Sequence, residues 1–461
     1  ILHTEMPKAG RAGPGEQLVC PIMQDSKIGH TPSERRRTHR EIPQGAYRNR
    51  RVHGRWELPR PPRPYITIAM IFQLFAALAC AQTIEYTLTP ATTTRTGQQK
   101  EFHPMSDYLV YVGSYAKGDE EGIHVYSFDT STGTLTPQRS VGGVENPSFL
   151  DISPDRRYLY AIGESSEVNG VPGGAVAAFA IDQQSGALTH INTQSAVGTG
   201  PCHISVDSTG CHVFVANYGG GSVAILPINE DGSLGEASDF VQHEGSSVDA
   251  SRQQEPHAHS IWVTPNNKHA FAPDLGLDKI KIYAIDHDSG KFSEQTSGEV
   301  DPGQGPRHLD FHPDGRRAYV INEMGNTVTV FDYDAEPGTL AAIQTISTLP
   351  EGYSEVSHTA DIHVHPNGKF LYGSNRGHDS IVIYAIDPDN GQLATIEIVA
   401  TGGNGPRNFG IDPTGNYLIA GNHGSNDIFT FKIDQATGRL TAVGERVKVP
   451  SPVCHKFIPA F

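Results

Sequence analysis

Short apolar runs alternate with turn sequences along the chain, and residues 305–340 show this pattern most clearly. Three runs in this stretch are rich in β-branched and aromatic residues, and the turn sequences Pro-Asp-Gly and Met-Gly-Asn separate them. β-branched and aromatic side chains favour a pleated, half-buried strand, whereas Gly, Pro, Asn and Asp favour tight turns. The stretch is therefore predicted to form a meander of antiparallel strands.

This unit is repeated along the sequence. A Gly-x-Leu or Gly-x-Phe turn occurs seven times, with 46 to 58 residues between successive copies. A repeat of about 50 residues has room for four short strands and is typical of a propeller blade. We therefore predict an all-β fold, a seven-bladed β-propeller. The seven turn glycines are Gly133, Gly186, Gly232, Gly290, Gly338, Gly391 and Gly438.

The two ends of the chain are predicted to meet in one blade. The first repeat begins at Tyr108 with its second strand, so it lacks an innermost strand of its own. Residues 452–457 at the C-terminus supply a strand of the required kind. Pairing these N- and C-terminal segments would close the ring and remove the exposed edges of an open array.

Charge is unevenly distributed along the chain. Residues 1–104 carry 15 Lys and Arg against 8 Asp and Glu, whereas the rest carries 20 against 43, a net charge of −23. So acidic a body is predicted to bind neither nucleic acid nor a membrane surface stably, because it has no basic field to release counterions. Any anionic ligand must be held by a few placed arginines.

Residues 1–104 are predicted to be a disordered or dispensable leader, and residues 105–461 the propeller. The leader contains an apolar run at residues 65–81 that resembles a signal peptide. Two alternatives follow: a cytoplasmic protein whose leader is dispensable, which we favour, or export directed by this run. The five cysteines include no Cys-x-x-Cys pair, which suits a reducing compartment. The sequence does not indicate an oligomeric state.

Comparison of the seven repeats separates scaffold positions from candidate site positions. A nearly uniform column of Asn and Asp ends each second strand and is predicted to be structural. Three other columns vary sharply and carry ionisable groups toward the mouth of the propeller, which is typical of a polar ligand site. The first holds Ser148, Cys202, His259, Arg307, Ala360, Arg407 and Val453; the second holds Phe149, His203, Ser260, His308, Asp361, Asn408 and Cys454; the third holds Ser114, Glu164, Tyr218, Leu275, Glu323, Arg376 and His423.

Arginine is the most informative residue type in these columns. Each of Arg307, Arg376 and Arg407 could merely brace a neighbouring blade, but three on one rim of an acidic chain point to an anionic ligand. Glu164 and Glu323 could balance these charges. The sequence thus predicts a site for a small anion.

A metal ion is the other possibility that the histidines raise. His257 and His259 lie two residues apart and could form half of a metal site, but the spacing shows no third ligand. We therefore predict no metal and no cofactor. No Gly-x-Ser-x-Gly elbow is present, which argues against a serine hydrolase.

The repeats resemble one known family. Gly-Pro-Arg-His-Leu-Asp-Phe-His-Pro-Asp-Gly, Gly-Pro-Arg-Asn-Phe-Gly-Ile-Asp-Pro-Thr-Gly and Leu-Tyr-Gly-Ser-Asn-Arg are similar to sequences of the seven-bladed β-propeller lactonases, over about residues 107–458. This family includes propeller-type 6-phosphogluconolactonases and carboxy-cis,cis-muconate cyclases. The resemblance implies lactone chemistry, either the opening of a ring or its closure.

The resemblance also implies a set of site residues. A His, Arg, Glu, Arg constellation of the cyclase branch falls on His259, Arg307, Glu323 and Arg376. Arg407 is the alternative for the last position, and His257 could replace His259. His203, Glu164, His257 and Arg407 are predicted to contact substrate.

The predicted function is hydrolysis of 6-phosphogluconolactone to 6-phosphogluconate, a step of the pentose phosphate pathway. Glu323 or His259 would activate water, Arg307 would stabilise the oxyanion, and Arg376 and Arg407 would hold the phosphate. Muconate cyclisation is one alternative. A non-catalytic binding platform is another, because propellers often serve that purpose.

Overall fold

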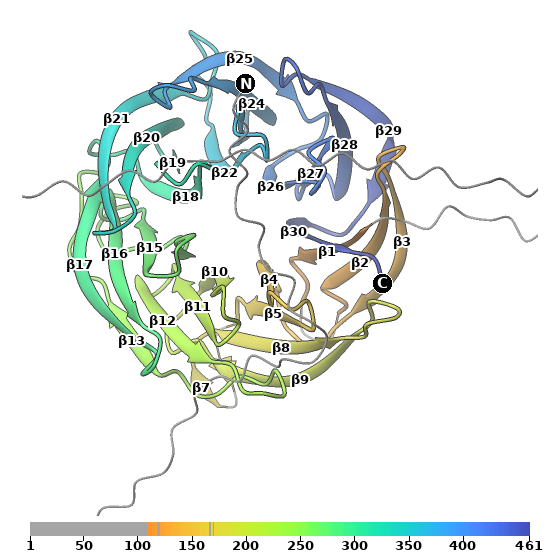
Figure 1. The fold of residues 1–461 in the computed structure, drawn as a ribbon, viewed down its shortest axis with the longest axis vertical. Coiled ribbons are helices and arrows are strands. Elements are labelled where there is room, and N and C mark those ends of the chain that lie inside the picture. The colour runs from red at the N-terminus through yellow and green to blue at the C-terminus, as the bar shows by residue number, and fades with distance from the viewer. Residues whose placement is uncertain (1–107, 118–119, 166, 169) are drawn as a thin grey trace, which may run out of the picture. The chain divides into compact units, whose positions relative to one another are not determined.

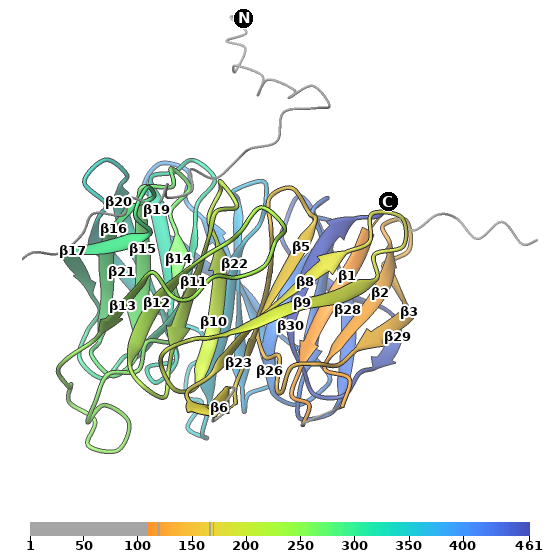
Figure 2. The same cartoon turned by 90° about the horizontal axis from the view of Figure 1, so that it is seen from below.

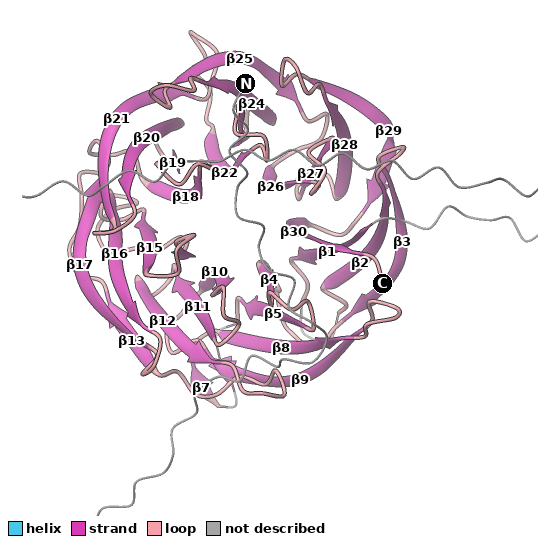
Figure 3. Cartoon of the chain, in the orientation of Figure 1, coloured by secondary structure: helices cyan, strands magenta, loops and turns pink. Residues whose placement is uncertain are grey.

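The computed structural model describes residues 108–117, 120–165, 167–168 and 170–461, and all of their regular structure is strand (Figure 3). The leader predicted for residues 1–104, including the apolar run, lies outside this range. No helix in the described part is long and apolar enough to cross a membrane.

The described residues form seven four-stranded antiparallel sheets arranged as a ring (Figure 1). From the innermost strand outward, the first three blades are β30 (Pro452–Pro459), β1 (Tyr108–Ser114), β2 (Ile123–Asp129) and β3 (Thr134–Val141); β4 (Leu150–Ile152), β5 (Tyr158–Gly163), β8 (Ala175–Ile181) and β9 (Leu188–Ser195); and β10 (Pro201–Val206), β11 (His212–Asn217), β12 (Ser222–Pro227) and β13 (Asp239–Gln242).

The remaining four blades follow the same order, and a separate hairpin joins β5 to β8. These blades are β14 (Trp262–Val263), β15 (His269–Asp274), β16 (Lys279–Asp286) and β17 (Lys291–Glu299); β18 (Pro306–Phe311), β19 (Arg317–Asn322), β20 (Thr327–Asp334) and β21 (Thr339–Ser347); β22 (His358–Val364), β23 (Phe370–Arg376), β24 (Ser380–Ile386) and β25 (Leu393–Ala400); and β26 (Pro406–Ile411), β27 (Tyr417–Asn422), β28 (Asp427–Ile433) and β29 (Leu440–Lys448). The hairpin pairs β6 (Glu167–Val168) with β7 (Val171–Pro172).

The ring closes as the sequence predicts. β1 pairs antiparallel with β30 from Tyr108 opposite Pro459 to Gly113 opposite Cys454, and β2 pairs with the other edge of β1. The first blade is thus built from both ends of the propeller (Figure 1). The prediction of an all-β, seven-bladed propeller closed in one blade is confirmed.

The recurring glycine turns join neighbouring blades. Gly232 has φ +81°, and a Cβ atom at this position would lie 2.1 Å from the Tyr158 ring of the preceding blade, so no other residue fits. Its carbonyl accepts the hydroxyl of Tyr160, also in the preceding blade, at 3.1 Å. The hydroxyls of Tyr111, Tyr319 and Tyr372 bind the turn glycine of the next blade in the same way. The turn is therefore a contact between blades as well as a hairpin.

The uniform asparagine column braces each blade internally. Asn217 donates its amide to the Ser222 hydroxyl at 3.2 Å, and Asn375 donates to the Ser380 hydroxyl at 3.2 Å. In both cases the partner lies five residues later, at the start of the third strand. The column is structural, as predicted, although the bond crosses to the next strand instead of closing the turn on its own backbone.

The antiparallel order gives the propeller two distinct faces (Figure 2). Loops that precede the innermost strands and follow the second strands open on one face, which we call the loop face; residues 243–261 and 323–326 belong to it. Hairpins between first and second strands and between third and fourth strands lie on the other, which we call the turn face; residues 207–211 and 287–290 belong to it.

Removal of residues 450–461 should destabilise the whole ring. Val453 and Ile458 are buried on β30, and each contributes about 1.5–3 kcal/mol by burial. The deletion also exposes an edge of β1. We expect the melting temperature to fall by roughly 10 °C or more, measured by circular dichroism. Removal of Ala460 and Phe461 alone, which follow the strand, should leave melting unchanged. Equal melting of both truncated proteins and the full chain would contradict this closure.

Candidate active site

Two side chains of the fifth blade form the core of the site. Arg307 is the second residue of β18, and Glu323 directly follows β19. The strand register shifts between Pro306 and His308, so Arg307 has no partner on β19. Such a bulge adds one residue to the strand and redirects its side chain. Arg307 Nε donates to Glu323 Oε2 at 3.1 Å, so these two candidates are in direct contact.

The same bulge recurs in other blades. It leaves Cys202 unpaired at the start of β10 and Arg407 unpaired at the start of β26. The first variable column of the sequence is therefore largely a column of bulged residues. Because a bulged residue does not serve the strand ladder, its side chain is free to differ between blades.

The carboxylate of Glu323 binds three arginines. Arg307 Nε and Arg376 Nη2 contact Oε2 at 3.1 and 2.8 Å, and Arg252 Nη2 contacts Oε1 at 2.8 Å. The carboxylate is buried, and so is Arg307, which is 1% exposed. Arg376, the last residue of β23, also donates Nη2 to the carbonyl of Thr359 at 2.8 Å. One buried anion thus holds side chains from two blades and one long loop.

Electrostatics keep this carboxylate ionised. Burial by itself would raise the pKa of Glu323, but Arg376, His259 and Arg307 hold the pKa well below its ordinary value. Burial and the neighbouring Arg407 lower the pKa of Arg307 to about 9, while Glu323 opposes this shift. At neutral pH both partners remain charged. With both oxygens already bound, Glu323 is a poor proton acceptor.

His259 lies beside this cluster. Its Nε2 is 3.6 Å from Glu323 Oε2, and its ring packs edge-on against Tyr218 at 5.1 Å. Residues 258–261 precede the short strand β14, and their only strand-like pairing is an isolated bridge between Ala258 and Asp274. The imidazole of His259 is therefore carried by an irregular segment. Burial lowers the pKa of His259 well below its ordinary value, and Arg307 lowers it further. His259 is therefore neutral at physiological pH.

Arg407 differs from the other arginines because it has no acidic partner. Its guanidinium lies over the ring of Tyr115, 5.8 Å from the centroid, and no described residue forms a hydrogen bond or ion pair with it. Glu164, the nearest predicted counter-charge, accepts a short hydrogen bond from the Ser148 hydroxyl instead. Arg376 also retains an unused donor, since its buried Nε has no acceptor among the described residues. The site therefore presents cationic donors that lack partners.

The charges in this cluster do not balance. Four arginines interact electrostatically here with three carboxylates, those of Glu164, Glu323 and Asp361, which leaves one positive charge. The arginines are Arg252, Arg307, Arg376 and Arg407. An excess of this kind in an acidic protein is the arrangement expected for an anionic ligand.

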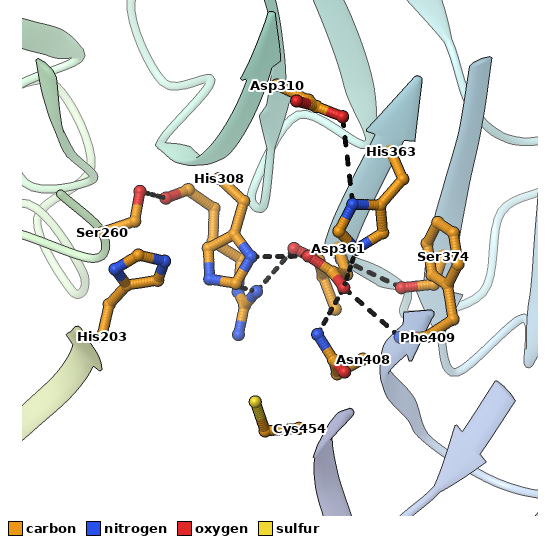
Figure 4. A network of polar contacts seen from close by, with 12 residues as sticks. His203, Ser260, His308, Asp310, Asp361, His363, Ser374, Asn408, Phe409 and Cys454 are labelled. Atoms are coloured by element: carbon orange, nitrogen blue, oxygen red, sulfur yellow. Dashed lines mark hydrogen bonds and ion pairs between the residues drawn. The ribbon is translucent and has the colours of Figure 1, made fainter. Parts of the chain in front are cut away.

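A second polar layer supports Arg307 (Figure 4). Arg307 Nη1 donates to His308 Nε2 at 3.1 Å, so the other ring nitrogen, Nδ1, carries the proton that His308 donates to Asp361 Oδ1 at 2.8 Å. Burial and Arg307 lower the pKa of His308 to about 3, although Asp361 opposes the shift, so His308 is neutral. The Ser260 hydroxyl binds the carbonyl of Arg307 at 2.7 Å. These contacts fix the guanidinium in place.

Asp361 connects three blades within this layer. Its Oδ2 accepts bonds from Asn408 Nδ2 at 2.5 Å and from His363 Nε2 at 3.0 Å. His455 Nδ1 in turn contacts Asn408 Oδ1 at 2.8 Å. Since β22, β26 and β30 carry these residues, the network joins the sixth and seventh blades to the closing strand.

Two of the predicted substrate contacts lie at the edge of the cluster. His203 is fully buried in the second layer, where its ring packs against Phe149 at 4.2 Å and Trp262 at 4.5 Å. His257 stacks on Tyr218 at 4.5 Å, and its Nδ1 donates to the carbonyl of Tyr218 at 3.0 Å. The structure brings neither imidazole to Glu323.

The histidine pair of the fourth blade does not form a metal centre in the described structure. His257 Nδ1 is occupied by a carbonyl, while His259 Nε2 faces Glu323. Within the described residues, no third potential ligand joins these two histidines. The two histidines also do not share one face of a strand, because β14 begins only at Trp262.

Sequence comparison missed Arg252. It lies in the loop between β13 and β14, and its Nη2 also donates to the Tyr218 hydroxyl at 3.1 Å. The loop is held by its own contacts, such as Gln253 Nε2 to the carbonyl of Leu275 at 2.8 Å. A signal was present, because the longest spacing between repeats, 58 residues, contains this loop, and Arg252 is the only Lys or Arg in residues 243–261.

Tyr115 was also missed, because the first repeat was aligned one residue out of register. Ser114, not Tyr115, occupies the structural column: its amide and hydroxyl both bind the carbonyl of Gly122. Tyr115 then takes the variable position beside Arg407, and Ser114 is removed from the candidate column. A small polar residue at the end of β1 was the signal that would have given the correct register.

Comparison with known proteins identifies relatives of this chain in sequence and in fold. The family model described as lactonase, 7-bladed beta-propeller, matches residues 109–457. A 6-phosphogluconolactonase of Bacillus subtilis is 38% identical over 77% of this chain and 99% of its own length. A solved structure from Bacteroides fragilis has a TM-score of 0.71 and 38% identity, covering 78% of this chain and 99% of its own. A periplasmic gluconolactonase from Pseudomonas aeruginosa has a TM-score of 0.72 and 34% identity, covering 76% and 99%.

Replacement of Glu323 should destabilise the protein strongly. In Glu323→Ala, Arg307 and Arg376 would stay buried without their counter-charge, which typically costs about 3–5 kcal/mol. Urea unfolding followed by fluorescence measures this loss. Glu397→Ala is the matched control, because Glu397 pairs with Arg439 on the surface, and such pairs contribute about 1 kcal/mol or less. Equal unfolding free energies for the two variants would contradict the role given to Glu323.

Proposed function

Because the chain belongs to the seven-bladed β-propeller lactonase family, we propose that it hydrolyses 6-phosphogluconolactone to 6-phosphogluconate. The Bacillus subtilis relative is named 6-phosphogluconolactonase, and this chain matches 99% of its length. The observation that supports the phosphorylated substrate is Arg407, which has no acidic partner and lies in a cluster with an excess of positive charge. A phosphate monoester carries a charge of about −1.5 to −2 at pH 7, so this cluster would attract it.

Arg407 and Arg376 hold the phosphate in this proposal. Arg407 offers its whole guanidinium, and Arg376 offers the buried Nε that lacks an acceptor. Arg252 contacts the same phosphate from the loop face, where its side chain is 35% exposed. A fork of fixed donors suits phosphate oxygens.

His259 acts as the general base. Its imidazole takes a proton from water while the water oxygen attacks the lactone carbonyl carbon, and Arg307 stabilises the oxyanion that forms. The oxyanion then collapses, the bond from the carbonyl carbon to the ring oxygen breaks, and His259 returns the proton to that oxygen. Glu323 stabilises the transient imidazolium from 3.6 Å. No net proton is consumed in the ring opening.

Glu323 therefore has a positioning role in this mechanism. Its two oxygens are bound by three arginines, and those arginines keep it ionised and weakly basic. A general base needs a free lone pair and a pKa near the working pH. Of the two candidate bases in the sequence, His259 fits these requirements better.

An unphosphorylated gluconolactone is the second candidate substrate. The Pseudomonas aeruginosa relative is a periplasmic gluconolactonase. The two candidate substrates therefore differ in whether they carry a phosphate, and the two possibilities also differ in compartment. We favour the phosphorylated lactone because of the positive charge of the cluster, and we keep the cytoplasmic location that was favoured from the sequence. N-terminal sequencing of the protein from its source checks the location, and a mature chain that begins just after the apolar run would overturn it.

Kinetics with both lactones test the proposal. We expect turnover of 6-phosphogluconolactone above the spontaneous rate, with a kcat about 10²–10³-fold lower in Arg307→Ala, which loses an oxyanion donor. His259→Asn should lower kcat by about 10²–10⁴-fold. Arg407→Ala should raise KM for the phosphorylated lactone by about 10- to 100-fold, the equivalent of about 1.5–3 kcal/mol. A coupled assay of 6-phosphogluconate formation measures these rates.

The control is Arg316→Ala, which removes an exposed arginine from the turn face of the same blade and should change neither constant. Full activity in both Arg307→Ala and His259→Asn would refute the catalytic assignment. If Arg407→Ala lost activity toward both lactones equally, the contact between Arg407 and the phosphate would be refuted, but the catalytic assignment would not.

The pH dependence of kcat should report His259. Its folded pKa is lowered, so the imidazole stays neutral and competent as a base until the pH falls below its ordinary value of 6.5. At saturating lactone, we expect kcat to be constant from about pH 6.5 to 8 and to fall only at lower pH. The acid limb should disappear in His259→Asn. A midpoint at or above 6.5 for the wild-type enzyme would argue against this base.

A further inference from the structure

Three potential metal ligands meet on the turn face, far from the candidate active site. Asp207 and His212 flank the turn between β10 and β11, and His287 follows β16 in the neighbouring blade. Their nearest ligand atoms, one carboxylate oxygen and two ring nitrogens, all lie within 4.8 Å of one another. Asp207 and His212 are buried, and the side chain of His287 is 30% exposed, so an ion could reach the group from solvent.

The distances fit a tetrahedral metal site. Asp207 Oδ2 is 3.6 Å from His212 Nδ1 and 3.2 Å from His287 Nδ1. Bonds of about 2.0–2.1 Å at tetrahedral angles place neighbouring ligand atoms about 3.3–3.4 Å apart. Both distances from the carboxylate oxygen are therefore close to those that zinc requires, and the two ring nitrogens lie within 4.8 Å of each other.

The hydrogen bonds of His287 leave one nitrogen directed at the carboxylate. Its Nε2 contacts the carbonyl of Asn267 at 2.6 Å and must donate to it. A neutral ring then has a lone pair on Nδ1, facing Asp207. Apart from their contacts with Asp207, the buried Nδ1 atoms of His212 and His287 have no hydrogen-bond partner among the described residues. Donation of the second ring nitrogen to a backbone carbonyl is the usual support of a metal-binding histidine.

The turn itself does not require these histidines. Asp207 caps it with Oδ1, which accepts the amides of Cys211 and His212. Asp412 caps the equivalent turn of the seventh blade by accepting the amide of Tyr417, and the histidine that contacts this turn, His365, binds the carbonyl of Gly415 and not the carboxylate. The two histidines are thus additional to the cap and converge on the second oxygen, Oδ2, which also accepts a hydrogen bond from the Thr209 hydroxyl at 2.7 Å.

We propose that Asp207, His212 and His287 bind a divalent transition-metal ion, with zinc as the best fit. Two imidazoles and one carboxylate provide three of its ligands, and solvent provides the fourth. The ion would join the third blade to the fourth on the face opposite Glu323. Its role is structural, since the ligands contact no residue of the candidate active site.

Zinc binding to tag-free, EDTA-treated protein tests the proposal. Competition with a chromophoric chelator should show about one zinc ion per chain, and zinc should raise the melting temperature because it binds only the folded state. Cobalt(II) should give the visible spectrum of a tetrahedral complex. His287→Gln should weaken the affinity by at least about 100-fold, since loss of a mere supporting group typically costs 10- to 100-fold.

His190→Gln is the control, because His190 is an exposed histidine on the outer strand of another blade. It should bind zinc as the wild type does. The alternative is a plain ion pair between Asp207 and a protonated His287. In that case zinc neither binds stoichiometrically nor raises the melting temperature, and this result overturns the proposal. Equal zinc affinity in His287→Gln and the wild type overturns it as well.

Discussion

The buried carboxylate of Glu323 is the interaction on which the centre of the ring depends. Two like charges 4 Å apart repel by about 4 kcal/mol at an effective dielectric constant of 20, and several arginines share this region. A single carboxylate in contact with Arg252, Arg307 and Arg376 converts that repulsion into a set of attractive pairs. The cluster nevertheless keeps an excess of positive charge, so it is stable enough to persist and still attracts an anion.

The propeller supplies the rigidity that such a cluster needs. Arg307, Arg376 and Arg407 come from three different blades, so their positions relative to one another depend on contacts between sheets. Tyrosine hydroxyls bound to turn glycines fix four of the blades against the next, and the pairing of β1 with β30 prevents the ring from opening. The arginines therefore cannot relieve their repulsion by moving apart, and their donors stay in place before substrate binds.

The sequence predicts the fold well and the site only in part, for physical reasons. Seven copies of one turn reveal the blade, because each copy performs the same packing task. Arg307 and Glu323 stand out because they occupy aligned positions and break the pattern. Arg252 could not be found by alignment, since its loop has no counterpart in other blades. The contacts of Glu323 with Arg376 and Arg252 were also beyond the sequence, because they cross blade boundaries that no spacing encodes.

Hydrogen-bond donors of two arginines at the centre of the ring have no partner among the described residues. A buried polar group without a partner typically costs about 1–3 kcal/mol, and a folded protein keeps such a cost mainly where function requires it. At this centre, the Nε of Arg376 has no acceptor among the described residues, and the guanidinium of Arg407 has no acidic partner. Both lie in the same cationic cluster, so one anionic ligand can satisfy them together and recover the free energy that their burial costs.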